Sequence, residues 1–471
     1  MQCATLLPIV SPFVRGSARQ FRVPFNWYMA NYNNAYSRDG TYGTGSHDMR
    51  GPKAWRNRPE LGPRPFLGVS RSFLDRLAAW GWLGGATFFE NEGWAGFHID
   101  DRDGEKKASF YAHDLNDLYM LSKQVDRGVA YAPVALLTPM LDMFAYNGAE
   151  NCVDQWTQPA FFYTLVPIRS GDAIFSELKR RGIEMYFVNS PFGAMWDVLC
   201  PDSGQPTENF AASLSPYRCA FLLGNGFEKG TVDAGALAEY VRNGGTLFVS
   251  ADQIADGIVP ADIAGVSFCG RTVQSGRNVS YADGCNATTL AEDYVLMQPE
   301  PGCSAKPFLR DENGGIVAFC SEMGLGRVVT VAAPRMLPAE WLDAGRGEYK
   351  ARLGGIISGA KQFSLVRFLL ERVQDETMPV DVEGSVQWGV NKTKDGWLVW
   401  LMNADGVEKF RGERQRIDLL RTSVVNVRMK RGAAANVTDA RTGLGVSTVG
   451  GAFQANVMPG EWRIFKVTNF K

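Results

Sequence analysis

The sequence lacks most of the residues and motifs from which a metal or cofactor site is usually recognised. Only three histidines occur in 471 residues, His47, His98 and His113, and they are too scattered to predict a histidine-rich metal site. None of the eight cysteines belongs to a CxxC pair, which argues against a zinc ribbon or a thioredoxin-like motif. We therefore expect neither a metal nor a cofactor. We interpret the cysteines as free buried thiols, with one or two disulfides as the alternative in an exported protein.

An excess of charge and a long apolar run are also missing. Lys and Arg number 49, and Asp and Glu number 50, whereas a nucleic-acid-binding protein would show a basic excess. No apolar run reaches the roughly 20 residues that span a bilayer. The N-terminal segment MQCATLLPIVSPFVR has no basic residues before its apolar stretch, which makes it a poor signal peptide. We expect no nucleic-acid or membrane partner, and both a cytoplasmic and an exported location stay open.

Aromatic side chains, by contrast, are abundant. Trp, Tyr and Phe make up 12% of the residues and hydrophobic residues as a whole 45%, enough for several cores. Aromatic rings fill cores, and they also stack on flat, hydroxyl-bearing ligands such as sugars. At roughly 100–200 residues per domain, the length predicts about three domains.

Residues 1–128 alternate between strand and helix. Strands are predicted over 25–30 and 86–90, and helices over 70–83 and 113–124. The helix over 70–83 has apolar residues at the spacing of an amphipathic face. This order is typical of an α/β barrel, so we assign these residues to part of one.

Residues 129–375 show a cleaner alternation. In AGALAEYVRNGGTLFVS (234–250) a helix ends in Asn243-Gly244-Gly245, and a strand with a buried pattern follows at once. The same alternation predicts a doubly wound, mostly parallel sheet like that of flavodoxin, with helices on both faces. Its strands are expected over 132–137, 184–189, 219–223, 246–250 and 327–332, and its helices over 171–181, 234–243 and 358–373.

Residues 376–471 lose the helical period. Val386, Trp388 and Val390 share one face of a short strand, the alternation of a half-buried strand. Further strands are expected over 396–403, 424–429 and 462–467, separated by turn sequences. We predict a small β-sandwich of about a hundred residues.

Part of a barrel, an α/β domain and a small β-sandwich, in this order, resemble the family 42 glycoside hydrolases, the β-galactosidases. The segments that carry the resemblance are GGATFFE (84–90), DRGVAYAPVALL (126–137) and LAEYVRNGGTL (237–247). The resemblance implies a TIM barrel, a trimerisation domain related to class I glutamine amidotransferases, and a β-domain. It also implies carboxylate-based hydrolysis of a β-galactoside or a related oligo- or polysaccharide, and a homo-oligomer, most simply a trimer, formed through 129–375.

Two features depart from this family. Residues 1–128 supply two strands, taken as the seventh and eighth, whereas a complete barrel has eight strands in roughly 250 residues. The acid/base of such barrels follows the fourth strand, which places it outside this chain, and the strand in FNWYMANYNN (25–34) ends in asparagines instead of a glutamate. Two hypotheses follow. The chain is a glycoside hydrolase or its C-terminal fragment, or it is a non-catalytic carbohydrate-binding or oligomerisation protein derived from one.

Glu90 and Glu92 are the first candidates for catalysis. They lie at the C-terminal end of a predicted barrel strand, on the side where barrel active sites are built. With one residue between them they point the same way, about 7 Å apart at their Cα atoms. Close carboxylates raise the pKa of one partner, which suits a general acid. The alternative is a polar rim, or ion pairs with Arg71 or Arg76.

Further candidates surround these two. Glu60, in the loop after the first strand, is the alternative nucleophile, and an ion pair with a neighbouring arginine is its other interpretation. For substrate binding, we expect stacking on the sugar by Trp27 and Trp94, and hydrogen bonds to its hydroxyl groups from Asn26, Asn31 and His98.

The middle domain lacks the residues of an amidotransferase. No cysteine follows the strand over 246–250, where such enzymes place their nucleophile, and no histidine occurs after His113. A Cys-His or Ser-His-Asp mechanism within 129–471 is therefore excluded. We expect this domain to be structural.

Overall fold

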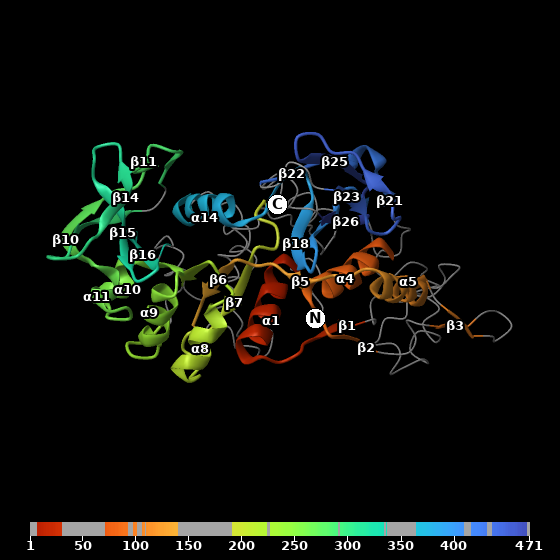
Figure 1. Cartoon of the computed structure of the whole chain (residues 1–471), viewed down its shortest axis with the longest axis horizontal. Helices are drawn as coiled ribbons and strands as arrows, with labels where there is room; N and C mark the ends of the chain where they lie inside the picture. Colours follow the sequence, from red (N-terminus) through yellow and green to blue (C-terminus); the bar gives the residue numbers. More distant parts are fainter. Residues whose placement is uncertain are drawn as a thin grey trace, which may run out of the picture.

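The computed structural model describes residues 7–30, 71–92, 98–100, 106–108, 110–139, 191–223, 227–290, 293–333, 336, 364–408, 416–430 and 436–468. Within these ranges the chain is a mixed α/β protein with several separate sheets (Figure 1). None of the helices in this part of the chain is long and apolar enough to cross a membrane.

The N-terminal part contains a pair of parallel strands, β1 (Asn26–Ala30) and β2 (Phe88–Glu92). The predicted elements over 25–30, 70–83, 86–90 and 113–124 are confirmed with small shifts of their ends. The assignment of residues 1–128 to the C-terminal portion of a barrel stays a prediction. The other elements here are α1 (Leu7–Phe21), α4 (Arg71–Gly84), β3 (His98–Asp100), β4 (Lys106–Ala108) and α5 (Phe110–Gln124).

The middle part of the chain forms a nine-stranded sheet, called the middle sheet below. Its strand order is β12-β11-β14-β15-β16-β9-β8-β6-β7. The strands from β16 to β7 are parallel, and the rest pair antiparallel. The parallel strands are β6 (Val134–Leu137), β7 (Trp196–Leu199), β8 (Cys219–Leu222), β9 (Thr246–Ser250) and β16 (Gly326–Val331). The antiparallel extension is β11 (Asn278–Tyr281), β12 (Ala287–Thr289), β14 (Lys306–Asp311) and β15 (Ile316–Met323).

Helices and a separate strand pair complete this region. The pair is β10 (Val266–Val273) and β13 (Tyr294–Pro299), and the helices are α8 (Thr207–Leu214), α9 (Ala234–Arg242), α10 (Ala251–Ala255), α11 (Ala261–Ala264) and α14 (Ser364–Thr377).

The sheet departs from the mostly parallel sheet that the sequence predicts. The expected strands over 132–137, 219–223, 246–250 and 327–332 are confirmed, while the strand over 184–189 and the helix over 171–181 lie outside the described residues. The antiparallel strands were not predicted. Strands such as β11 and β12 are short and keep exposed polar side chains, so their sequences read as loops.

Two antiparallel sheets form the C-terminal part. Phe453 of one sheet lies 4.9 Å from Phe465 of the other between ring centroids, so the two sheets pack face to face. The three-stranded sheet is β17 (Val380–Glu383), β22 (Ser423–Met429) and β25 (Ala452–Val457). The six-stranded sheet is β24 (Gly445–Val446), β23 (Asn436–Asp439), β26 (Trp462–Thr468), β19 (Gly396–Met402), β18 (Gln387–Thr393) and β5 (Val129–Ala130). Short elements β20 (Val407–Glu408), β21 (Arg416–Ile417) and η8 (Leu419–Arg421) lie beside them.

A strand pairing crosses the predicted domain boundary at 375. β5 belongs by sequence to the start of the middle domain, yet it pairs with β18 of the C-terminal sheet. The division of the chain at 128 and 375 stays a prediction.

Helix α1, which the sequence does not predict, packs against the edge strand β7 of the middle sheet (Figure 1). The approach is close: a Cβ atom at Gly16 would lie 1.9 Å from the carbonyl oxygen of Val198. Pro12 and Gly16 lie inside this helix, and both residues lower helix propensity, which explains why its sequence pattern is weak.

A buried ionic network joins α1 to β7. The fully buried carboxylate of Asp197 accepts hydrogen bonds from Arg15 Nε at 2.6 Å and from a terminal guanidinium nitrogen of Arg19 at 2.6 Å. The Tyr217 hydroxyl donates to the same carboxylate at 2.8 Å. Burial, followed by the charge of Asp197, raises the pKa of Tyr217, so it stays a neutral donor.

Helix α4 is held by the six-stranded sheet instead. The rings of Trp80 and Trp400 meet edge to face with centroids 5.0 Å apart. The buried amide of Asn391 donates to the carbonyl of Leu83 at 2.8 Å. A second hydrophobic core, separate from that of the middle sheet, fills the space between α4, β1 and this sheet.

We expect Asp197→Asn to lower the free energy of unfolding by about 3–5 kcal/mol, because it leaves the buried guanidinium of Arg15 and the half-buried one of Arg19 without their counter-charge. Chemical denaturation measures this change. The matched control is Glu322→Gln, which breaks the exposed ion pair to Lys306 and is expected to cost less than about 1 kcal/mol. Equal effects of the two variants would contradict a structural role for the network.

Candidate functional site

The parallel pair β1–β2 presents one face to solvent, on which Asn26, Phe88 and Glu90 lie. In its register Asn26 is beside Phe88, and Glu90 lies two residues further along the same face. The amide nitrogen of Asn26 donates to Glu90 Oε2 at 2.6 Å. Glu90 is exposed and Asn26 is half-buried, so the structure brings together two of the residues that the sequence singles out, at a surface open to solvent.

The opposite face of the pair belongs to the core. Trp27 is 3% exposed and packs directly on Gly81 of α4, where a Cβ atom would lie 2.5 Å from the indole ring. The expectation that Trp27 stacks on a sugar is therefore corrected. A strand has two faces, and here the aromatic residue lies on the one that α4 and the C-terminal sheet cover.

The other candidates are described in part or not at all. Glu92 is the last residue of β2, and His98 begins β3, but of both only the backbone is described. Glu60, Asn31 and Trp94 lie outside the described residues. Their roles stay predictions.

The carboxyl ends of the middle parallel strands are where open α/β sheets bind ligands. Here the end of β9 is closed. Ser250 is fully buried, its backbone N–H donates to Gln253 Oε1 at 2.9 Å, and Gln253 in turn donates to the carbonyl of Leu222 at 2.8 Å. Ser250 is thus the N-cap residue that precedes α10, and its burial makes it unavailable as a nucleophile.

Two buried thiols of the described residues do not provide a nucleophile either. Burial raises the pKa of Cys219 to about 12, and that of Cys200 to about 12, so both stay protonated. Cys285 and Cys303 are exposed, Cys320 is half-buried, and all five described cysteines are free. The described residues contain no group of three or more His, Cys, Asp or Glu side chains that fits a metal ion.

A polar pocket of about 520 Å³ lies between α4, α5 and β26. Asp75 Oδ2 accepts a hydrogen bond from the indole of Trp462 at 2.8 Å, and the guanidinium of Arg441 lies 4.4 Å from the centre of the same indole. Asp114 and Asp117 line the pocket as well. The sequence analysis missed this group, because single aspartates on amphipathic helices look like solvated surface residues.

The Asp75 carboxyl has a raised pKa. Burial is the main cause, the hydrogen bond from Trp462 acts against it, and the charge of Asp114 adds to it. The neighbouring guanidinium of Arg76 is buried, and desolvation lowers its pKa to about 10. Ionised Asp75 is thus a cost to the folded state.

Comparison with known proteins gives a fold but no family. No family model matches the sequence, and no curated protein matches it. Among solved structures, α-L-fucosidase isoenzyme 2 from Paenibacillus thiaminolyticus is 14% identical, with a TM-score of 0.50 over 98% of this chain and 62% of its own. A β-galactosidase from Bacillus circulans sp. alkalophilus (11% identity, 96% and 57% covered) and the GH42 β-galactosidase Gan42B (12% identity, 99% and 57% covered) each have a TM-score of 0.49.

The structural similarity to the fucosidase supports a glycoside-hydrolase-like α/β fold and nothing narrower. The chain spans about three fifths of the length of the solved structures it matches. The resemblance found in the sequence is thereby supported at the level of the fold.

Asp75→Asn tests the pocket at α4. A carboxyl whose folded-state pKa is raised stabilises the fold below its unfolded pKa, and this stability is lost as the pH rises through the folded-state pKa. We therefore expect Asp75→Asn, which keeps an acceptor for Trp462, to raise stability at pH 7 by on the order of 1 kcal/mol, and to leave it unchanged near pH 4. Thermal melting at the two pH values measures this, with the exposed Asp117→Asn as control. A loss of stability at pH 7 would sink the interpretation.

Proposed function

We propose that the chain acts as a glycoside hydrolase, or as the C-terminal part of one, on a β-galactoside or a related oligo- or polysaccharide. The observation that carries the proposal is the exposed Glu90, placed by a parallel strand pair and held by Asn26 at 2.6 Å. The glycoside-hydrolase-like fold supports it. Carboxylates at the ends of parallel barrel strands are the groups with which such folds cleave glycosidic bonds.

In this proposal Glu90 works with a second carboxylate. Glu92, two residues further along β2, is the first candidate for it, and Glu60 is the alternative nucleophile. One carboxyl protonates the leaving oxygen, and the other attacks the sugar or activates water, depending on their separation. The Asn26 amide orients the Glu90 carboxylate, while Asn31, Trp94 and His98 contact the sugar.

A non-catalytic carbohydrate-binding or oligomerisation protein is the second candidate. The segment FNWYMANYNN (25–34) ends in asparagines where the family is expected to carry a glutamate, which favours this candidate. Saccharide binding without turnover would favour this candidate.

Glu90→Gln tests the catalytic role. The variant keeps the size of the side chain and a hydrogen bond to Asn26, and we expect kcat on an aryl β-galactoside to fall by about 10²–10⁴-fold with little change in KM. Glu239→Gln, at an exposed position of α9, is the matched control and is expected to match the parent.

Two other outcomes lead elsewhere. A higher KM with an unchanged kcat would make Glu90 a binding residue. If kcat and KM both equal those of the parent, the assignment of Glu90 is wrong, and Glu60→Gln is the next variant to measure.

We further propose a homotrimer with contacts from residues 129–375. Leu325, in the turn between β15 and β16, is 85% exposed and offers an apolar contact in this region. We expect light scattering at micromolar concentration to give three times the mass of one chain. A monomer would remove the basis of this proposal.

A further inference from the structure

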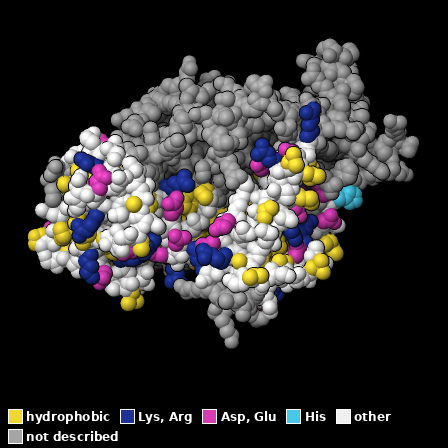
Figure 2. Space-filling model, turned by 90° about the horizontal axis from the view of Figure 1, so that it is seen from above, with side chains coloured by type: hydrophobic (Ala, Val, Ile, Leu, Met, Phe, Trp, Pro, Cys, Tyr) yellow, Lys and Arg dark blue, Asp and Glu magenta, His cyan; other side chains and the backbone are white. Residues whose placement is uncertain are grey.

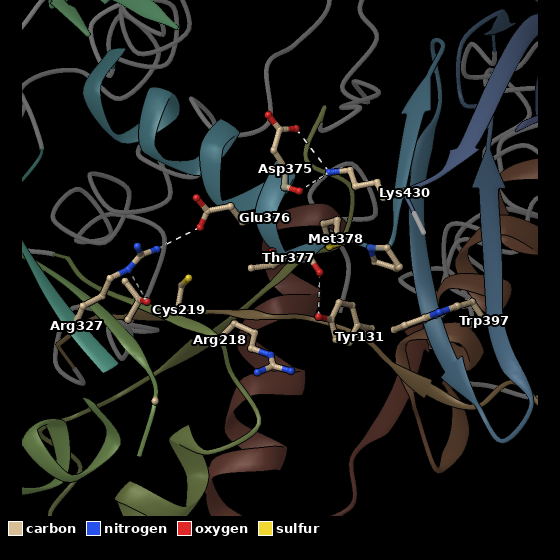
Figure 3. A pocket seen from close by; sticks show the side chains of 13 residues that line it. Tyr131, Arg218, Cys219, Arg327, Asp375, Glu376, Thr377, Met378, Trp397 and Lys430 are labelled. Atoms are coloured by element: carbon tan, nitrogen blue, oxygen red, sulfur yellow. Dashed lines mark hydrogen bonds and ion pairs between the residues drawn. The ribbon is translucent and has the colours of Figure 1, made fainter. Parts of the chain in front are cut away.

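A cleft of about 720 Å³ lies on the side of the middle sheet opposite to its carboxyl edge (Figure 3). One wall comes from residues at the amino ends of β8, β9 and β16, namely Arg218, Thr246 and Arg327. The other comes from the end of α14 and from the C-terminal sheets, with Tyr131 and Trp397 side by side. In the space-filling view of Figure 2, Lys and Arg (dark blue) and Asp and Glu (magenta) side chains lie together between the two lobes of described residues.

Two of the three cations in this cleft are already neutralised. Arg327 is 3.2 Å from the carboxylate of Glu376 and 3.3 Å from the hydroxyl of Thr246. Lys430 is 3.0 Å from Asp381 and donates to the last carbonyls of α14, a helix C-terminus that attracts a cation. Both side chains therefore serve the junction between α14 and the sheets.

Arg218 differs from them. Its backbone N–H donates to the carbonyl of Pro133 at 2.7 Å, which fixes the start of β8. Its guanidinium is exposed, and among the described residues it has no ion pair and no side-chain hydrogen bond. A planar cation without a side-chain partner in the described part of the chain thus lines the cleft, and a guanidinium binds a carboxylate through two hydrogen bonds.

Two aromatic rings line the same cleft. Tyr131 and Trp397 are half-buried and meet edge to face, with ring centroids 5.0 Å apart at 73°. The Tyr131 hydroxyl donates to the carbonyl of Thr377 at 3.0 Å, so this ring is held in place. Amphipathic rings of this kind pack against the apolar face of a sugar.

We propose that this cleft binds an acidic monosaccharide unit, with its carboxylate on Arg218 and its ring against Trp397. The exposed guanidinium of Arg218 favours a ligand with an anionic group. The aromatic rings and the cleft volume of about 720 Å³ favour a ring-sized ligand over a small inorganic anion. The thiol of Cys219 in the wall of the cleft stays protonated, because burial raises its pKa to about 12. The site does not depend on the hydrolase proposal, since it shares no residue with the Glu90 face.

Calorimetric titration of the full chain tests the site, with D-glucuronate, neutral D-glucose and inorganic sulfate as the three probes. We expect glucuronate to bind more tightly than either of the others, and Arg218→Gln to weaken it by at least about tenfold, the effect of one lost charge-assisted hydrogen bond. The matched control is Arg310→Gln on β14, whose exposed guanidinium has only a weak 3.5 Å contact to a carbonyl.

A second variant separates the sugar from its charge. Trp397→Phe keeps a ring beside Tyr131, and we expect it to weaken glucuronate several-fold and to leave sulfate unaffected. Thermal melting confirms that both variants fold. The proposal is overturned if glucuronate does not bind, if sulfate binds as tightly, or if Arg218→Gln binds glucuronate as the parent does.

Discussion

The buried carboxylate of Asp197 is the constraint on which the described structure depends most. Removing a carboxylate from water costs several kcal/mol unless opposite charge and hydrogen bonds replace the lost solvation. The middle sheet supplies one donor, Tyr217, while both guanidinium groups come from α1, about 180 residues earlier in the sequence. The edge strand β7 therefore carries its charge at low cost only when α1 lies against it, and the N-terminal segment is part of the folding unit of the middle sheet.

This constraint also positions the candidate site. α1 ends at Phe21, and β1 begins at Asn26, so the anchoring of the helix determines where the first strand starts. The partner strand β2 follows α4, which Asn391 and Trp400 fix to the C-terminal sheet. The face that carries Asn26 and Glu90 is thus held by two different sheets. A change in either of them is transmitted to the spacing of the two strands, although neither sheet contributes a side chain to that face.

Elements with a strong local signal could be predicted from the sequence, and elements that depend on distant partners could not. The strand Thr246–Ser250 follows a helix with a glycine cap and matches its prediction at both ends. α1 was missed because its helical pattern is weakened by Pro12 and its stability comes from Asp197. At the site, a strand was predicted over 86–90 and lies at Phe88–Glu92, and the role of Glu90 stays a prediction. The burial of Trp27 was not predicted, because alternation along a strand gives two faces without saying which one a helix will cover.

The distribution of open and closed surfaces around the middle sheet argues for a supporting role of that sheet. The end of β9, one of the carboxyl ends where a doubly wound sheet usually binds ligands, is closed by the Ser250–Gln253–Leu222 hydrogen bonds. The buried thiols of Cys219 on β8 and of Cys200, directly after β7, stay protonated. No histidine is available after His113 to activate a hydroxyl or a thiol. In the described part of the chain two polar surfaces lie away from this edge, the β1–β2 face with Glu90 and the cleft at the amino ends of the parallel strands. The cleft is built on the middle sheet, on the side opposite to its carboxyl edge.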